Sequence, residues 1–581
     1  MLNNVIEEIK ENMKKNSDNH IIRKNILREY DFKLPIEYHD HKKLSDIVAS
    51  DIEFTGDQNI MTQIYNDDYN LLIDKHSRIY SQDKTFLKEN QKFINQFNFS
   101  KNTIDEFITE YVKYKSIPDF MNKFQYIQIS RFDYLNKNPV AMHLLGMYNF
   151  SSPFLSLVSP ILGLILPYFI LWFKGFRPGF SEYLVLIKNI VYNNYFIKGI
   201  LNFHKNSLQT NAYTLASIFI YVMSVYNNII LCINYYHSLN SLSSFMDKYN
   251  KFLHEGKNLL HTIQSQTSKY GKFQAFTNSL NKYEDKIKNL IQNTESFCNS
   301  NEDMSKYGNM GQVLKCNYEL FMDEDSHDTV MFIIYLNQYC KDLLCLKQKI
   351  NDRQMNKCIF MKKSSKKHPK INKSYYLSYI NHDSCVKNDV KLDKNIIITG
   401  PNASGKTTMI KSVLINLFLS QSCGFGCYDQ CKTYIYDNFY SYLNIPDTSN
   451  RDSLFQAEAR RCKEIIETIS KDKSEQNFCI FDEIYSGTNP NDAVLCADIY
   501  LRGMNMYKKN VDYIITTHYI ELCEKMEKED KIVNKKMLIN KKDDNFIYTY
   551  KFVDGISKVN GGFQVLKDLN YPSYLLDLHN A

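Results

Sequence analysis

Apolar and charged positions alternate at helical spacing through much of the chain. Residues 105–124 are one example, and apolar residues three and four positions apart share one face of a helix. The pattern returns over residues 247–354, where Pro and Gly are few. We therefore predict an N-terminal helical region over residues 1–137 and a long-helix, lever- or clamp-like region over residues 247–354.

Residues 138–246 depart from this pattern. No Asp, Glu, Lys or Arg occurs from Asn138 to Phe173 or from Asn206 to Met246, and each run is long enough to cross a bilayer. Pro153, Pro160 and Pro167 in the first run, and Asn227, Asn228 and Asn234 in the second, weaken simple spanning helices. Between the runs, Glu182 is the only acid, and the basic residues are Lys174, Arg177, Lys188, Lys198 and Lys205.

This region predicts a hydrophobic helical hairpin, for which two interpretations are open. It is either a pair of helices buried in a larger core or a membrane-associated hairpin. The basic connector conflicts with the positive-inside tendency if both flanks are cytoplasmic. Within the membrane interpretation, we therefore expect interfacial insertion rather than full spanning.

Strand and helix patterns alternate over residues 355–581. Apolar, β-branched and aromatic runs typical of strands occur at residues 395–399, 432–443, 477–481 and 512–517, and a hairpin pattern covers residues 538–552. Helical patterns separate the runs. Such alternation predicts an α/β domain with a largely parallel sheet and an antiparallel addition.

Composition limits the number of domains, the class of partner and the state of the cysteines only broadly. A length of 581 residues predicts two to four domains. A net charge of +7 is too small to identify a nucleic-acid partner. The 14 cysteines show no paired metal spacing, although Cys423, Cys427 and Cys431 would share a face if they lay on a helix. Buried free thiols in a reducing, intracellular compartment are the expected state, and the N-terminus has no apolar run of a secretory signal.

Residues 395–408, NIIITGPNASGKTT, carry a phosphate-loop pattern between an apolar strand and a helix. Glycines let backbone N–H groups close on phosphates, assisted by the helix N-terminus. Lys406 would reach the β- and γ-phosphates, and the Thr407 hydroxyl would hold Mg²⁺. The residues expected to bind ATP here are Gly400, Pro401, Asn402, Ala403, Ser404, Gly405, Lys406, Thr407 and Thr408.

Two carboxylates and a histidine follow at strand ends. Asp482 would hold Mg²⁺ with Thr407, and Glu483 would orient and deprotonate the attacking water. The alternative to this catalytic interpretation is that Asp482 and Glu483 are ordinary surface carboxylates at a strand end. His518 ends the next strand, where a lone histidine is usually structural. However, this order is that of ABC-type ATPases, in which such a histidine senses the γ-phosphate, so we predict that Glu483 and His518 are catalytic.

Together these motifs resemble the MutS family of DNA mismatch-repair ATPases. The resemblance covers roughly residues 365–581 and more loosely the helices before them. Residues 452–466 place Ser453, Phe455 and Glu458 in register with the family's S-T-F-x-x-E segment. The other matching elements are Gly400–Thr407, Asp482-Glu483 with Gly487-Thr488 and Asp492, Thr517–Leu522, His368-Pro369, and Val386–Asp389 with Asn388.

The resemblance implies an ABC-type P-loop ATPase domain with ATP and Mg²⁺ as cofactors. It places Asn388 among the nucleotide-binding residues and Ser453 in the partner subunit's ATP site, so the protein would be a homodimer or heterodimer through this domain. It also implies DNA binding of the mismatch-repair type. Two alternatives stay open: a membrane-associated ATPase without mismatch recognition, and a nucleotide-gated clamp with little turnover.

Three departures qualify the resemblance. Arg451 stands where the family usually has Gly, and Cys385 stands where an aromatic residue often stacks on adenine. Neither Phe180-Ser181-Glu182 nor Phe481-Asp482-Glu483 lies where the family's mismatch-reading Phe-x-Glu motif belongs. Base preference and mismatch recognition are therefore open, and the two uncharged runs have no counterpart in the repair proteins.

Overall fold

The computed structural model divides into two compact units, named unit 1 and unit 2 here. Unit 1 comprises Met1–Ile26, Asn102–Asn258 and Tyr283–Met331, and unit 2 comprises Leu27–Lys101, Leu259–Lys282 and Phe332–Ala581. The residues described are 26–27, 30–56, 59–65, 70–100, 103–117, 120–176, 179–193, 207–298, 308–362, 367–382, 385–443, 454–542, 545–559, 569 and 571–572. Each unit joins segments that are distant in the sequence.

The described part of unit 1 is helical. Its helices are α6 (Ile104–Lys115), α7 (Phe120–Lys123), η2 (Ser130–Lys137), α8 (Pro139–Phe173), α9 (Phe180–Asn193), α11 (Leu208–Thr267), α12 (Gln274–Cys298), α14 (Met310–Met322) and α15 (Glu324–Asn351). Three of them, α11, α12 and α15, also have residues in unit 2. The Phe107 ring of α6 lies 4.2 Å from the Phe252 ring of α11. A Cβ on Gly311 would lie 2.1 Å from the Pro139 carbonyl oxygen, so glycine lets α14 approach the start of α8.

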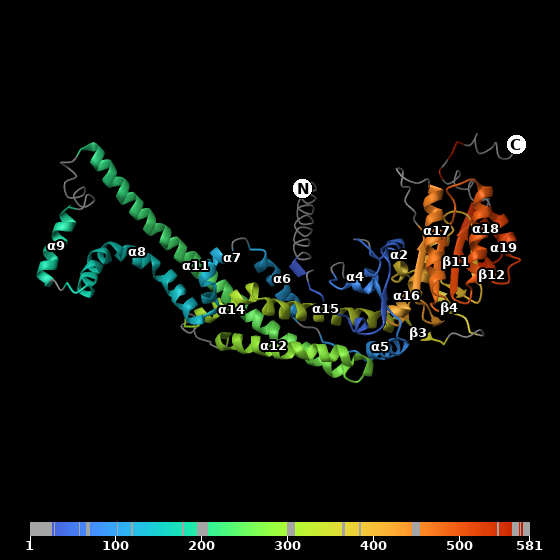
Figure 1. The fold of residues 1–581 in the computed structure, drawn as a ribbon, viewed down its shortest axis with the longest axis horizontal. Helices are drawn as coiled ribbons and strands as arrows, with labels where there is room; N and C mark the ends of the chain where they lie inside the picture. The colour runs from blue at the N-terminus through green and yellow to red at the C-terminus, as the bar shows by residue number, and fades with distance from the viewer. Residues whose placement is uncertain are drawn as a thin grey trace. The chain divides into compact units, whose positions relative to one another are not determined.

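The two uncharged runs form α8 and the part of α11 from Leu208 to Met246 (Figure 1). The two helices run antiparallel, because Tyr221 lies within hydrogen-bonding distance of the Ser156 and Leu157 carbonyls while Cys232 lies near Phe150. Within the described residues, Asn211–Thr267 is long and apolar enough to cross a membrane, and none of its most apolar window is buried. A largely helical N-terminal region with a long apolar helix is thus confirmed, but the most apolar part of this helix is not buried.

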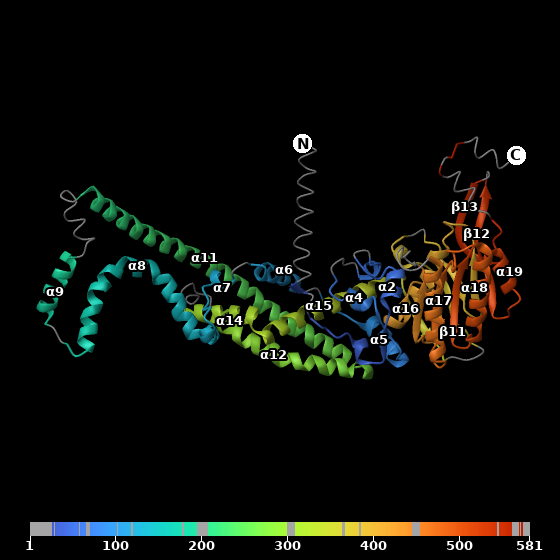
Figure 2. The same ribbon diagram turned by 45° about the horizontal axis from the view of Figure 1, so that its top comes forward.

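A six-stranded sheet organises the C-terminal part of unit 2 (Figure 2). Its strand order is β13-β12-β6-β11-β10-β9, and all neighbours are parallel except β13, which pairs antiparallel with β12. The strands are β6 (Asn395–Thr399), β9 (Asn438–Tyr442), β10 (Asn477–Asp482), β11 (Val511–Thr517), β12 (Ile532–Lys542) and β13 (Asn545–Asp554). The predicted parallel sheet and its antiparallel hairpin are confirmed.

Side chains point alternately to the two faces of a strand, and the central strands are buried at nearly every position. Both faces of the sheet are therefore apolar, and helices cover both. One face packs α17 (Leu454–Lys471), α18 (Pro490–Met506) and α19 (Ile520–Met526) in a single core with Phe481 and Ile515. The other face contacts α16 (Lys406–Ser422). Every residue of α16 from Ser412 to Gln421 is buried, so this helix needs a cover on its far side as well.

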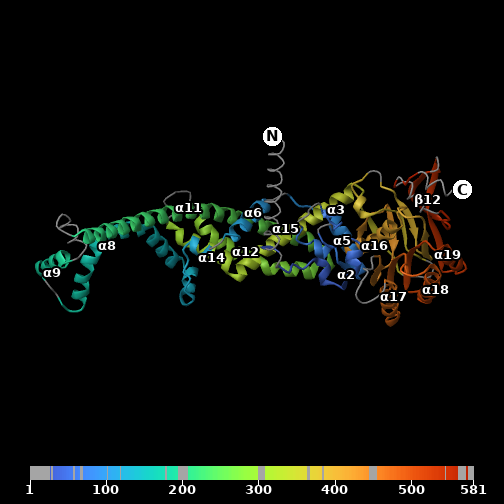
Figure 3. The same cartoon turned by 90° about the horizontal axis from the view of Figure 1, so that it is seen from above.

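The segment Leu27–Lys101 supplies part of that cover (Figures 1 and 3). The rings of Phe54 and Tyr80 lie 5.3 Å and 6.0 Å from the Phe418 ring of α16, and the Ser441 hydroxyl of β9 donates to Asp51 at 2.6 Å. The elements here are η1 (Pro35–Tyr38), β1 (His41–Lys43), α2 (Asp46–Asp51), α3 (Thr62–Tyr65), α4 (Ile73–His76), β2 (Ile79–Ser81) and α5 (Lys84–Gln96). This segment therefore belongs with the α/β unit and includes a short antiparallel strand pair.

A second, five-stranded sheet completes unit 2. Its order is β5-β4-β8-β3-β7, and its strands are β3 (Asn356–Phe360), β4 (Lys370–Ser374), β5 (Asn388–Lys391), β7 (Phe425–Gly426) and β8 (Gln430–Thr433). The short helices η3 (Gly271–Phe273) and η4 (Leu377–Tyr379) also lie in this unit. The single strand expected at residues 432–443 is wrong: its two ends belong to β8 and β9, in different sheets.

Candidate active site

The loop between β6 and α16 has the backbone that a phosphate site needs. Ala403 and Gly405 have positive φ angles of 62° and 90°, and Gly405 directly precedes α16. A Cβ on Gly400 would lie 2.8 Å from the Ser404 hydroxyl oxygen, and one on Gly405 would lie 3.1 Å from the Tyr550 ring. Side chains at these two positions would therefore strain or crowd the loop.

The polar groups of the loop favour an anion. The Ser404 hydroxyl is buried and has no hydrogen-bond partner among the residues that the structure describes, so it is available to a phosphate oxygen. The Lys406 ammonium is 5% exposed and donates to the carbonyls of Gly400 at 3.0 Å and Pro401 at 3.3 Å. Burial lowers the pKa of Lys406, and the nearby Glu483 opposes this shift.

Asp482 lies at the carboxyl end of β10, beside the start of α16. The Thr407 hydroxyl donates to its Oδ2 at 2.8 Å, and the Thr516 hydroxyl of β11 donates to its Oδ1. Adjacent parallel strands bring Asp482 and Thr516 into register. Carboxylate and hydroxyl oxygens are suitable ligands for Mg²⁺, so Thr407 and Asp482 fit the predicted metal site.

Glu483 and His518 meet above the same loop. Glu483 Oε1 lies 2.7 Å from His518 Nε2 and 3.4 Å from Lys406 Nζ. His518 Nε2 also lies 2.9 Å from Asn402 Oδ1 and 3.2 Å from Lys406 Nζ. The His518 contact is the largest cause that holds the pKa of Glu483 below its ordinary value.

The backbone of Glu483 is unusual for a residue with a side chain. Its φ angle is 50°, and its N–H donates to the Thr516 carbonyl at 3.1 Å. Positive φ is rare outside glycine and is often found at functional positions. Here it turns the chain away from β10 directly after Asp482, so the two neighbouring carboxylates have different partners.

A cavity of about 610 Å³ adjoins these groups, which is within the usual range for a small-molecule site. Its walls include the loop from Asn402 to Thr408, Glu483, and an aromatic side formed by Tyr376, Tyr379, His382 and Tyr550. The cavity and the buried, unpaired Ser404 hydroxyl together fit a nucleotide whose phosphates lie on the loop.

The family resemblance assigned nucleotide-binding roles to Asn388 and Ser453. Asn388 borders the cavity, but its side chain is bonded to β13: Nδ2 donates to the Tyr550 carbonyl and Oδ1 accepts from the Phe552 N–H, both at 3.0 Å. In this structure Asn388 positions the strand beside the loop. Ser453, together with Arg451, lies outside the described residues, so its assignment in trans stays a prediction.

Glu458 is a supporting residue whose role the sequence did not reveal. It is 3% exposed and accepts from the Ser486 N–H and Gly487 N–H at 3.1 Å each, and from the Ser486 hydroxyl at 3.0 Å. The sequence did contain an indication of this role, because Glu458 and Gly487 both belong to motifs that match the family. Their contact across residues distant in sequence was not predictable.

The cysteine pattern has no metal-site geometry. Cys423 follows α16, Cys427 lies in a loop and Cys431 lies on β8, so the three do not share a helical face. Cys431 instead lies 3.7 Å from Cys358 through the sulfur atoms. No group of three or more metal-ligating side chains occurs among the described residues.

Comparisons with known proteins match the C-terminal part of the chain. Residues 396–580 match MutS domain V. A DNA mismatch repair protein MutS from Pseudothermotoga lettingae is 28% identical over 201 residues, covering 33% of this chain and 24% of that protein. The corresponding protein from Caldicellulosiruptor saccharolyticus is 26% identical over 312 residues, covering 52% and 33%. Endonuclease MutS2 from Lactococcus lactis subsp. cremoris is 27% identical over 195 residues, covering 33% and 24%.

The matches thus span about a quarter to a third of the length of these relatives. They support domain V at the C-terminus and, in one case, part of the preceding region. The apolar helices α8 and α9 lie before the family match.

Proposed function

Because this chain is a divergent member of the MutS family over its C-terminal third, we propose that it is a MutS-like, ATP-dependent DNA-binding protein of the mismatch-repair type. The observation that carries the proposal is the convergence of Lys406, Glu483 and His518 beside a cavity of about 610 Å³. These three residues come from three separate elements and supply the charges that ATP hydrolysis needs.

In this proposal, the loop Gly400–Thr408 binds the ATP phosphates. Lys406 exchanges its bonds to the Gly400 and Pro401 carbonyls for phosphate oxygens, which are stronger partners for an ammonium. The Ser404 hydroxyl and the N–H groups at the start of α16 add neutral donors. Thr407 and Asp482 would hold Mg²⁺, which would neutralise charge on the β- and γ-phosphates.

Glu483 is the proposed general base. Its lowered pKa keeps it deprotonated at neutral pH, which is the state that a general base requires. His518 bridges Glu483 and Asn402 of the loop. This position lets His518 orient the base and respond to a γ-phosphate bound beside Lys406.

We propose that the working form is a homodimer or heterodimer in which Ser453 completes the partner subunit's ATP site. Mixing Ser453→Arg protein with Lys406→Ala protein tests this arrangement. Each variant alone should be inactive, and the mixture should recover turnover through one intact composite site in each heterodimer. Full turnover by a protein that is monomeric at nanomolar concentration would exclude the shared site.

DNA binding is tested on the full-length protein with matched and mismatched duplexes at several salt concentrations, with and without ATP. Phosphate contacts require the affinity to fall linearly with salt on logarithmic axes, and the mismatch-repair type requires a preference for the mismatched duplex. Absence of binding at low salt would refute the DNA-binding proposal while leaving the ATPase proposal intact.

Two alternative functions would give different assay results. A nucleotide-gated clamp would bind ATP without significant turnover. A membrane-associated ATPase without mismatch recognition would hydrolyse ATP, fractionate with membranes and show no preference for mismatched DNA. The exposed apolar helix α11 is the observation that favours the second alternative.

A further inference from the structure

Helices α8 and α11 of unit 1 leave many large apolar side chains exposed. On α8 the exposed fractions are 66% for Phe154 and 53% for Phe169, and on α11 they are 64% for Phe219 and 67% for Ile220. Exposed apolar surface of this extent is unusual for a water-soluble face and marks a surface for a partner or a membrane.

The length of the exposed part matches the apolar layer of a bilayer. Among the side chains that the structure describes, large exposed apolar residues recur on α8 from Phe154 to Phe173 and on α11 from Tyr213 to Ile233. At 1.5 Å per residue, each stretch is ~30 Å long, close to the ~30 Å hydrocarbon thickness. Nearer the helical body of unit 1, where α8 packs on α14, exposure on α8 is confined to one face: Val140, Leu144, Met147 and Tyr148 are exposed, whereas Met142 is buried. On α11, Tyr235 is buried at the corresponding end.

The width of the apolar surface distinguishes lipid from a protein partner. Ile229, Ile230 and Leu231 are successive residues of α11 with exposed fractions of 41%, 38% and 52%. Successive residues are ~100° apart around a helix axis, so apolar surface extends over ~200°. A partner helix would cover a narrower stripe, whereas lipid chains surround a helix on every side that the protein leaves open.

The far end of α8 has the residues of a membrane interface. Tyr168 and Trp172 precede Lys174 at the end of the helix, and Trp172 is 45% exposed. Tryptophan and tyrosine favour the headgroup region, and a lysine beyond them is placed in water or among phosphates. The Tyr168 ring also lies 4.8 Å from Tyr183 of α9, which places part of α9 at the same end.

We propose that α8 and α11 insert into a lipid bilayer as an antiparallel pair that crosses the hydrocarbon layer, with Trp172 at the headgroup depth farther from the helical body of unit 1. This differs from the interfacial insertion expected from the sequence, because the two exposed stretches are each long enough to cross the layer. The inference is independent of ATP hydrolysis.

The chain contains one tryptophan, so its fluorescence reports on this position without any substitution. Full-length protein is reconstituted in phosphatidylcholine vesicles with a minor fraction of phosphatidylglycerol, brominated either near the headgroup or near the chain end. We expect blue-shifted emission, stronger quenching by the shallow bromines than by the deep ones, and weak quenching by iodide. Quenching by iodide alone, or strongest quenching by the deep bromines, would overturn the proposal.

A pair of variants provides the second test. Phe219→Asp with Ile220→Asp places two charges in the proposed lipid-facing stretch. Ile499→Asp is the control, since Ile499 is a similarly exposed isoleucine, 63%, on α18 of unit 2. After carbonate washing, the double variant should move from the pellet to the supernatant while the control stays in the pellet, and both should still bind a fluorescent ATP analogue.

Other occupants give different results. A second copy of the chain on these helices would give a detergent-free oligomer with Trp172 protected from iodide and unquenched by brominated lipid, which would contradict the proposal. So would a double variant that remains in the pellet after the wash. If the double variant fails to bind nucleotide, the wild-type quenching experiment still decides.

Discussion

Glu458 offers a direct test of how α17 supports the proposed base. Its buried carboxylate accepts from Ser486 N–H and hydroxyl through Oε1 and from Gly487 N–H through Oε2. Ser486 and Gly487 follow Glu483 closely in the chain. The carboxylate therefore fixes the loop that leaves Glu483, and Glu458→Gln tests that support with little change in side-chain shape.

The expected magnitude follows from the three bonds. Glutamine has one carbonyl oxygen, so whichever way its amide is turned, at least one N–H group of the loop faces an NH₂ group. A buried polar group left unsatisfied costs about 1–3 kcal/mol, and loss of the charge weakens the remaining bonds. We expect Glu458→Gln to destabilise this loop by about 1–3 kcal/mol and to lower ATP turnover, with ATP affinity nearly unchanged because Lys406 is untouched.

Hydrogen exchange of the peptide containing Ser486 and Gly487 measures this effect locally, since the full chain is unsuited to two-state unfolding analysis. Glu467→Gln is the matched control on the same helix: its side chain is 57% exposed and forms a surface pair with Lys463 at 3.7 Å, worth under about 1 kcal/mol. Exchange and turnover of Glu458→Gln equal to those of the control would refute the reasoning.

Glu483→Gln should retain ATP binding while turnover falls by about 10²-fold or more, the scale of a general base, whereas Lys406→Ala should lose ATP binding; near-normal turnover in Glu483→Gln would exclude it as the base. His518 is the main cause of the lowered Glu483 pKa, whose ordinary value is 4.5, so activity should fall only as the pH drops below that value. His518→Ala should move this acid limb to higher pH, and an unmoved limb in a pH–turnover profile would contradict the contact. A fragment of residues 355–581 should aggregate and bind no ATP, because Phe418 and its neighbours on α16 lose their cover; a soluble, ATP-binding fragment would show that the cover is dispensable.

Local patterns predicted the parallel strands and the loop before α16 because both depend on neighbouring residues. β6 and β11 are continuous buried runs, which is typical of strands covered on both faces. Since parallel strands end at the same edge of a sheet, the ends of β6, β10 and β11 also predicted that Asp482, Glu483 and His518 would lie near Lys406. The motif order was thus sufficient to predict which side chains lie around Lys406.

Contacts between distant residues set the limit of that prediction. The Tyr-rich run at 432–443 has strand propensity throughout. However, Tyr434 and Tyr436, which lie between β8 and β9, both bond to Asp512 of β11, and the chain passes from one sheet to the other there. Likewise, the cysteines after α16 suggested a helical face, but the helix ends at Ser422 and Gly424 has a φ angle of 94°, which a continuing helix does not allow.

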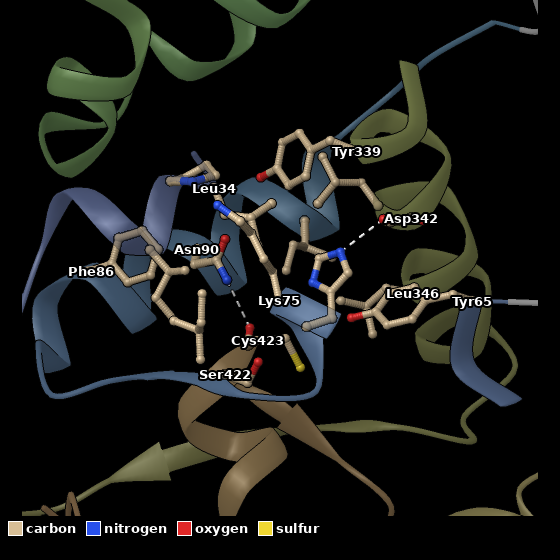
Figure 4. Close-up of a pocket in the computed structure, with 16 residues that line it drawn as sticks. Leu34, Tyr65, Lys75, Phe86, Asn90, Tyr339, Asp342, Leu346, Ser422 and Cys423 are labelled. Carbon is tan, nitrogen blue, oxygen red and sulfur yellow. Dashed lines mark hydrogen bonds and ion pairs between the residues drawn. The ribbon is translucent and has the colours of Figure 1, made fainter. Parts of the chain in front are cut away.

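A pocket within unit 2 shows how far the N-terminal segment reaches (Figure 4). Asp342 of α15 lies 2.9 Å from His76 Nε2 and accepts from Gln338 at 3.0 Å. On the opposite side, Asn90 of α5 donates to the Cys423 carbonyl at the end of α16 at 3.0 Å. The segment thus bonds both to α15 and to the end of the helix that begins at the phosphate loop, a connection that the periodicity of residues 1–137 does not reveal.

The pairing of Phe54 with Phe418 also imposes an order on biosynthesis. The ribosome makes Phe54 about 360 residues before Phe418, which at ~5–20 residues per second is a delay of ~20–70 s. During this interval Phe54 and Tyr80 have emerged without the helix that they cover, and the apolar residues of α8 and α11 emerge in the meantime. Unit 2 can therefore complete its fold only late in translation, after any co-translational recognition of those helices, and its exposed aromatic residues are candidates for chaperone binding until then.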